Sequence, residues 1–130
     1  MAEELTPDEL AFLQQVLDWA REGETDRLRE VVAGGVPVNL TSGAGDSLLM
    51  LAAYHGHPET VRALLELGAD TERVNDRGQT ALGAAVFRQS EPAVRALLAH
   101  GADPEGGRRT ALEVAAVFEL DEMARLLRGT

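Results

Sequence analysis

The sequence SLLMLAAYHGHPETVRALLELGAD at residues 47–70 returns in altered form as TALGAAVFRQSEPAVRALLAHGAD at residues 80–103. The spacing between the two stretches also separates Gly35 from Gly68 and Gly68 from Gly101. Self-similarity at a fixed period of about 20 to 50 residues is typical of proteins built from stacked repeats. The sequence therefore predicts an array of similar units that share one continuous core.

Each unit has the pattern of two short helices joined by a tight turn. The apolar run at residues 49–53 predicts the first helix. Pro58 favours the start of the second, because the first turn of a helix leaves its N–H groups without partners. Leu64 and Leu65 then fall at helical spacing on a buried face. Gly68 is expected to end this helix, since glycine adopts the left-handed cap at little cost.

The two ends of the array differ from its middle, as capping units do. Residues 6–9, Thr-Pro-Asp-Glu, form a capping box at the start of a longer, acidic helix, in which Phe12 and Trp19 are predicted to lie in the core. At the other end, Thr110 follows Thr80 more closely than Thr80 follows Ser47, so the last hairpin is shorter. We predict a single domain, residues 1–130, with four units at approximately 6–42, 43–75, 76–105 and 106–130.

The repeated motifs resemble the ankyrin repeat, whose unit is a β-turn followed by two antiparallel helices. The resemblance is carried by Thr80-Ala81-Leu82, Gly56-His57 and Gly68-Ala69-Asp70, and it extends from about residue 10 to the end of the chain. It implies an all-α fold, an α-solenoid of about four ankyrin repeats joined by hairpin loops, with capping end repeats. It also implies a hydrogen bond between repeats at His57. The family's Thr-Pro-Leu-His opening is replaced here by residues 47–50, 80–83 and 110–113, which predicts weaker turns.

The chain lacks the residue patterns expected of an enzyme or a metal site. It contains no cysteine, and His55 and His57 are separated by a single residue, so on a helix they would diverge. Asp70 and Asp103 each follow a helix-ending glycine, where a carboxylate is expected to accept turn N–H groups. The glycines mark repeat boundaries and form no phosphate-binding loop. We therefore predict no catalytic activity, no metal and no cofactor.

Charge and hydropathy also bear on partners and location. The chain carries 22 acidic residues against 12 arginines and no lysine, a formal net charge of −10. Such an acidic chain is disfavoured as a nucleic-acid binder because it repels phosphate. No apolar run approaches the roughly 20 residues of a membrane span, and the acidic start is unlike a secretory signal. We expect a cytoplasmic protein, monomeric when alone, from a GC-rich bacterial genome.

The resemblance implies a protein-binding surface made by the hairpin tips and the exposed residues of the first helices. On the first helices these positions are Arg21, Glu22, Tyr54, His55, Phe87, Arg88, Val117 and Phe118. At the hairpin tips they are Gly43, Ala44, Asp46, Asp76, Arg77, Gln79, Gly106, Gly107 and Arg109.

Aromatic residues concentrate on this surface. The chain has five aromatic residues, and Tyr54, Phe87 and Phe118 are three of them. Tyr54 and Phe87 are one repeat period apart and should therefore stack. Three arginines accompany them: Arg77, Arg88 and Arg109. Exposed aromatic side chains with arginine are typical of protein-binding hot spots. In the alternative interpretation, the rings tuck beneath the hairpins as part of the core.

Two functions remain open from the sequence. The first is a protein–protein interaction module, an adaptor or regulatory subunit that binds a partner protein through its groove and hairpin tips. The second is an inhibitor or immunity-type protein that blocks an enzyme with its acidic N-terminal helix. Charge reversal at Glu3, Glu4, Asp8 and Glu9 is expected to matter only for the second function.

Overall fold

The computed structural model describes residues 5–129, and eight helices lie within this range. They are α1 (Pro7–Glu22), α2 (Thr25–Ala33), α3 (Leu48–Tyr54), α4 (Pro58–Glu66), α5 (Ala81–Phe87), α6 (Glu91–Ala99), α7 (Ala111–Val117) and α8 (Asp121–Arg128). No strand is present between residues 5 and 129, where Thr41 and Ser47 form one isolated β-bridge. The predicted all-α solenoid is confirmed.

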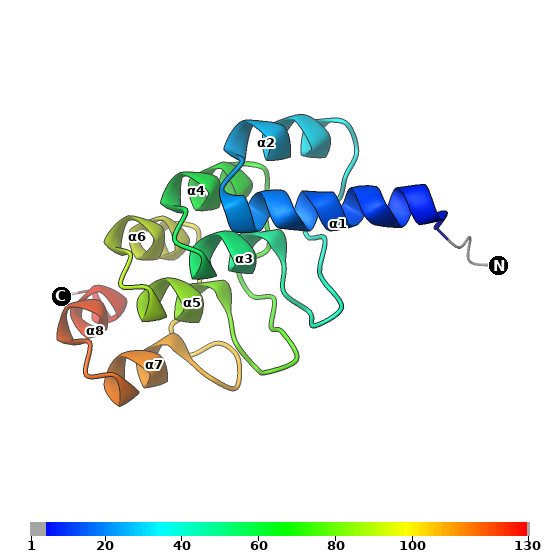
Figure 1. Ribbon diagram of the computed structural model, residues 1–130. Coiled ribbons are helices and arrows are strands. Elements are labelled where there is room, and N and C mark those ends of the chain that lie inside the picture. The colour runs from blue at the N-terminus through cyan, green and yellow to red at the C-terminus, as the bar shows by residue number, and fades with distance from the viewer. Residues whose placement is uncertain (1–4, 130) are drawn as a thin grey trace.

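The helices form two rows that run side by side along the molecule (Figure 1). Helices α1, α3, α5 and α7 make one row, in which each contacts the next. Helices α2, α4, α6 and α8 make the other row in the same way, and each successive pair packs together. The long loops between pairs all project to the same side (Figure 1). This arrangement leaves a groove between the projecting loops and the first row, which we call the inner row.

The core between the two rows is aliphatic. Its large side chains include Leu28, Leu49, Leu64, Leu82 and Leu97, each at most 1% exposed. Small side chains of the inner row are buried as well: Ala52, Ala53 and Ala85 are each 0% exposed. Burial of branched aliphatic side chains is the main stabilising contribution to such a fold.

The prediction that Phe12 lies in the core is wrong, because its side chain is 44% exposed. Helix α1 has 16 residues whereas α3 has seven, so its N-terminal half extends past the neighbouring helix (Figure 1). Trp19 is only partly buried against the core. Its ring meets Phe12 edge-on at 6.3 Å, and the Arg27 guanidinium lies 5.4 Å from its centre.

A hydroxyl side chain caps every helix of the inner row. Thr6 accepts a hydrogen bond from the Glu9 backbone N–H, and the Glu9 carboxylate accepts one from the Thr6 N–H, which completes the predicted capping box. Ser47, Thr80 and Thr110 accept from the backbone N–H three residues later, each at 3.1 Å. These bonds satisfy N–H groups that a helix leaves without internal partners.

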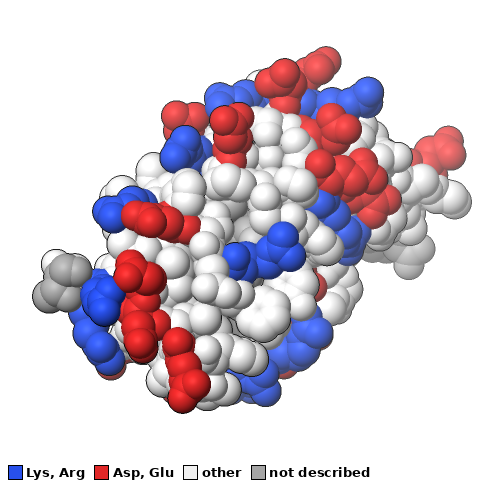
Figure 2. Space-filling model, turned by 60° about the vertical axis from the view of Figure 1, so that its left-hand side comes forward, with Lys and Arg blue, Asp and Glu red and all other residues white. Residues whose placement is uncertain are grey.

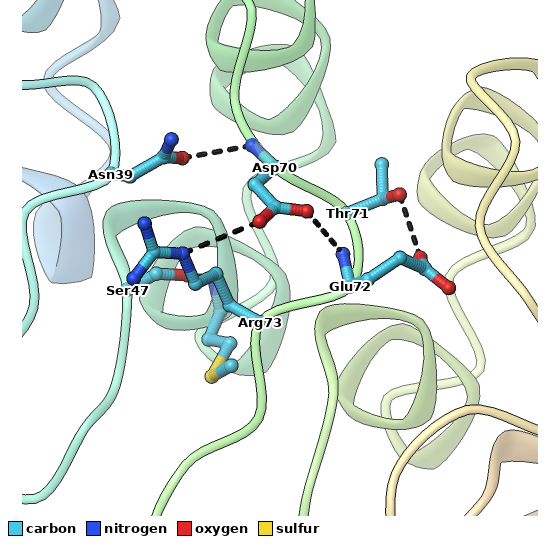
Figure 3. Close-up of polar contacts among 7 residues, drawn as sticks. Asn39, Ser47, Asp70, Thr71, Glu72 and Arg73 are labelled. Atoms are coloured by element: carbon cyan, nitrogen blue, oxygen red, sulfur yellow. Dashed lines mark hydrogen bonds and ion pairs between the residues drawn. The ribbon is translucent and has the colours of Figure 1, made fainter.

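Polar side chains link the loops of successive repeats (Figure 3). The Asn39 side chain accepts a hydrogen bond from the Asp70 backbone N–H at 2.8 Å, and Glu72 accepts one from the Asp103 N–H at 3.3 Å. Within each loop, Asp70 and Asp103 accept from the N–H two residues later, as predicted. Because the same bonds recur one repeat period apart, they hold neighbouring loops in register.

Gln89 occupies a backbone conformation that normally favours glycine. The turns inside the first two pairs place Gly23 and Gly56 at φ of 76° and 79°, and Gln89 takes the equivalent place with φ of 56°. For residues other than glycine this conformation costs about 1–2 kcal/mol. Glycine would remove that cost, but the benefit is partly offset by the greater freedom of glycine in the unfolded chain.

We expect Gln89→Gly to raise the free energy of unfolding by about 1 kcal/mol. Urea denaturation followed by circular dichroism measures this change. Gly68→Ala is the matched control, because Gly68 has φ of 92° and an added Cβ would meet no atom within 4 Å. It should lose about 1 kcal/mol from backbone strain alone. A lower stability of Gln89→Gly would contradict the assigned strain.

Candidate functional site

A row of three aromatic rings crosses the inner row of helices. Tyr54 ends α3, Phe87 ends α5 and Phe118 follows α7. The Tyr54 and Phe87 rings stack 6.0 Å apart at an angle of 8°, and Phe118 meets Phe87 edge-on at 5.4 Å. Their exposed fractions are 46%, 44% and 54%, so the rings lie at the surface and the interpretation as core residues is wrong. We call these three side chains the aromatic row.

Two adjoining hollows lie between the aromatic row and the hairpin loops, and they share Tyr54, Gln79 and Ala84. Other residues lining the first hollow include Arg21, Asp46, Met50, His55, Asn75 and Arg77. The other residues lining the second hollow are Gly83, Phe87, Arg109, Val114 and Phe118.

Basic side chains border this surface although the whole chain is acidic. Arg77, Arg88 and Arg109 make no ion pair with any residue in the range 5–129, whereas Arg21 pairs with Asp18 at 2.7 Å. Figure 2 shows an uncharged area bordered by basic side chains, while most acidic side chains in this view lie toward its upper and left edges. Among the described residues, three arginines line the two hollows, Arg21, Arg77 and Arg109, and one acidic residue does so, Asp46.

Asn75 holds one hairpin tip in shape, a role that the sequence did not reveal. Its side chain is 5% exposed and accepts hydrogen bonds from the backbone N–H groups of Arg77 and Gln79 at 3.0 and 2.9 Å. Its amide group donates to Asp46 at 2.8 Å and to the Gln79 side chain at 3.0 Å. Asn75 therefore fixes the position of Arg77 and Gln79 above the first hollow.

Turn glycines make room for side chains of the following repeat. The His57 ring bonds through Nε2 to the Arg21 carbonyl oxygen at 2.7 Å, which confirms the hydrogen bond expected between repeats. This ring lies directly against Gly23, where an added Cβ would come within 2.6 Å of it. Arg88 lies in the same way against Gly56, with 2.7 Å between an added Cβ and Nη2. A side chain at Gly56 would therefore displace the Arg88 guanidinium of the following repeat.

The structure brings together most of the residues that the sequence singles out. Nine of them line the two hollows: Arg21, Asp46, Tyr54, His55, Arg77, Gln79, Phe87, Arg109 and Phe118. The other singled-out residues line neither hollow: Glu22, Arg88, Val117, which is 74% exposed, and the hairpin-tip residues Gly43, Ala44, Asp76, Gly106 and Gly107. Sequence reasoning missed the floor of the hollows, Met50, Gly83, Ala84 and Val114. The signal for Gly83 was its place in a motif position that carries a side chain in other repeats.

His55 has a lowered pKa in the folded chain. Burial opposes its charged form, and the nearby charges of Arg21, His57 and Arg88 act in the same direction, while Asp46 opposes them. Because the folded-state pKa lies below the unfolded value near 6.5, protonation favours the unfolded chain. Above the unfolded pKa, His55 is neutral in both states and costs no stability. As the pH falls from that value toward the folded-state pKa, the folded chain loses stability.

We expect the His55 ring to titrate below its ordinary value in an NMR pH series, and Arg21→Gln to move the midpoint upward. Added salt should act in the same direction because it screens the arginine charges. Ring carbon and proton shifts of His55 measure the midpoint. A midpoint that stays unchanged in both Arg21→Gln and high salt would show that arginine charge does not set it.

Between residues 5 and 129, no group of three or more histidine, aspartate or glutamate side chains is placed to hold a metal ion. The described helices also include none with the length and apolar character needed to cross a bilayer. The features found on the inner row are exposed rings, arginines and two hollows, a composition suited to contact with another macromolecule.

The family of the chain follows from comparison with known sequences. A family model described as ankyrin repeats in three copies matches residues 17–106 and also residues 49–129. The chain belongs to the ankyrin repeat family. Ankyrin repeats are protein–protein interaction modules, typically without catalytic activity, and their stacked units form extended concave binding surfaces.

Two relatives illustrate the similarity. An ankyrin repeat protein of Pseudomonas aeruginosa is 49% identical over 59 residues, which is 45% of this chain and 34% of that protein. The crystal structure of the human ASB11 ankyrin repeat domain has a TM-score of 0.78 and 29% identity, covering 88% of this chain and 52% of that one. The chain thus spans about half of the ASB11 domain, and the matched segment about a third of the Pseudomonas protein.

Proposed function

We propose that the chain is an adaptor or regulatory subunit that binds a partner protein through the groove beside its inner row of helices. The observation that carries this proposal is the aromatic row, three exposed rings from three successive repeats in mutual contact. In this proposal the chain acts as a cytoplasmic monomer and performs no catalysis.

The composition of the groove supports the proposal. Aromatic rings give a large contact area with few rotatable bonds, and arginine gives planar, directional hydrogen bonds. The rings already contact one another in the free chain, which reduces the conformational entropy that binding would cost. Arg77 and Arg109 line the hollows beside the rings, form no ion pair within residues 5–129 and are suited to carboxylates of a partner.

The acidic N-terminal helix is a less favourable binding surface. Glu9 is engaged in the capping box, and the hydrogen bonds from the Thr6 backbone and hydroxyl hold the pKa of its carboxyl below the ordinary value. Asp8 is exposed on the same turn, and Glu3 and Glu4 lie outside the described residues. Exposed apolar side chains, Leu10 and Phe12, interrupt the acidic surface of α1.

Affinity capture from a lysate of the source organism tests which surface binds. The baits are the wild-type chain, a groove variant with Tyr54→Ala and Phe118→Ala, and a charge-reversal variant with Glu3→Lys, Glu4→Lys and Asp8→Lys. Glu9 is left intact because it caps α1. We expect the groove variant to lose the protein that the wild-type chain retains, and the charge-reversal variant to keep it. The opposite pattern would favour the inhibitor function.

A further inference from the structure

Helix α5 lacks a side chain at a position where neighbouring inner helices have one. Counting from the capping residue of each helix, the fourth residue is Met50 in α3 and Glu113 in α7, but it is Gly83 in α5. Gly83 is buried in the helix interior, where glycine is less favourable than any residue except proline. Its backbone conformation does not require glycine, since its φ lies outside the left-handed region.

Packing does not require glycine at this position either. An added Cβ would meet the Thr80 hydroxyl at 3.5 Å, the Arg109 carbonyl oxygen at 3.7 Å and the Val114 side chain at 4.0 Å. These are ordinary contact distances, so alanine would fit without displacement of its neighbours. The consequence of glycine is instead that the second hollow, which Phe87 and Phe118 also line, reaches the backbone of α5 at Gly83.

The second hollow combines apolar walls with a single charged group. Its apolar lining consists of the rings of Tyr54, Phe87 and Phe118 together with Val114 and Ala84. Arg109 is the only charged residue that lines it within the described part of the chain, where this arginine also forms no ion pair. No carboxylate from residues 5–129 lines this hollow, in a chain whose net charge is −10.

From these features we infer the chemistry of the partner that the groove accepts. The second hollow takes one apolar side chain of a partner protein. Arg109 binds the carboxylate of a residue next to that side chain. Arg77 lines the neighbouring first hollow. The occupant is an acidic segment of a partner protein with an apolar anchor residue. Gly83 determines this specificity by leaving the space open. The inference rests on the proposed function of the groove and adds the class of partner to it.

Selection from a displayed library of random dodecapeptides tests the inference without a known partner. We expect the wild-type chain to enrich peptides in which leucine, isoleucine, methionine or phenylalanine adjoins aspartate or glutamate. Gly83→Met fills the hollow with the side chain that Met50 has at the same position of α3. It should lower the affinity for a selected synthetic peptide at least about tenfold. Gly83→Ala should weaken it less while raising the denaturation midpoint, because it removes the glycine from a helix interior.

A double-mutant cycle between the peptide and Arg109 tests the carboxylate contact. Replacing the acidic residue of the selected peptide with glutamine should weaken binding to the wild-type chain, and this loss should shrink in Arg109→Gln, as coupled partners require. Circular dichroism of each variant establishes that the helices are retained. If Gly83→Met does not fold, the smaller loss expected for Gly83→Ala still distinguishes an occupied hollow from an empty one.

The failure of this inference and the failure of the proposed function give different results. If selected peptides bind equally well to Tyr54→Ala and Phe87→Ala, they do not use the groove, and both statements are overturned. If those two variants lose binding while Gly83→Met and Gly83→Ala keep it, the groove binds but the hollow is not used. Enriched peptides without acidic residues would overturn the assigned partner chemistry alone.

Discussion

Replacing Leu64 with alanine is expected to lower the free energy of unfolding by about 2–5 kcal/mol. Leu64 is 0% exposed and lies in α4, which packs against α2, α3 and α6. Truncation removes most of a buried side chain and leaves a cavity that neighbouring repeats cannot fill without moving. Leu97 has the equivalent place in α6 with the same exposure, and its truncation should have a similar effect.

Urea denaturation of Leu64→Ala and of the wild-type chain measures the difference. Arg62→Ala is the matched control, because Arg62 is on the exposed face of the same helix. It should change stability by less than about 0.5 kcal/mol, as surface substitutions do. An equally small effect at Leu64 would mean that its side chain does not contribute to the core.

The second large effect is expected in binding, at Phe87. This ring is central in the aromatic row and contacts both Tyr54 and Phe118. Removing a central hot-spot side chain weakens association by about 2 kcal/mol or more, which is about 30-fold in affinity. Folding should lose less, about 1 kcal/mol, since the ring is 44% exposed and its aromatic contacts are at the surface.

Calorimetry with a captured partner or selected peptide measures the affinity, and thermal denaturation measures the stability of Phe87→Ala. Phe12→Ala is a close control, because Phe12 is the same residue type with the same exposure of 44% but lies on the projecting half of α1. It should leave affinity unchanged. Unfolding of Phe87→Ala would contradict the small stability loss expected of a surface ring, and normal binding by the folded variant would exclude the groove as the site.

Much of the fold could be predicted because the repeat imposes the same local requirements several times. The repeat period predicts where helices begin and end, and Ser47, Thr80 and Thr110 cap them as the motif requires. Prediction failed where the repeat ends. Phe12 has no counterpart in a later unit, and its exposure depends on how far α1 extends beyond its neighbours, which helical spacing does not reveal.

The candidate site was predictable in its exposed residues but not in its depth. Period alignment places Tyr54 and Phe87 on one surface, and the structure agrees. The contact of Phe118 with Phe87 was not predictable, because the last unit is shorter and alignment pairs Phe87 with Val117 instead. The second hollow exists because Gly83 has no side chain and because Val114 of the next inner helix lies beside it. Both depend on three-dimensional packing. That these residues bind a partner stays a prediction.

The position of Trp19 gives the molecule a built-in optical reporter of one end. It is the only tryptophan, it lies in α1, and its indole is held between the core and the Arg27 guanidinium. Indole emission therefore follows the environment of the first repeat alone, whereas far-ultraviolet ellipticity averages over all helices. Stacked repeats interact chiefly with their neighbours, so their ends can melt separately. Recorded in one denaturant series, the two signals reveal whether this array melts as one cooperative unit.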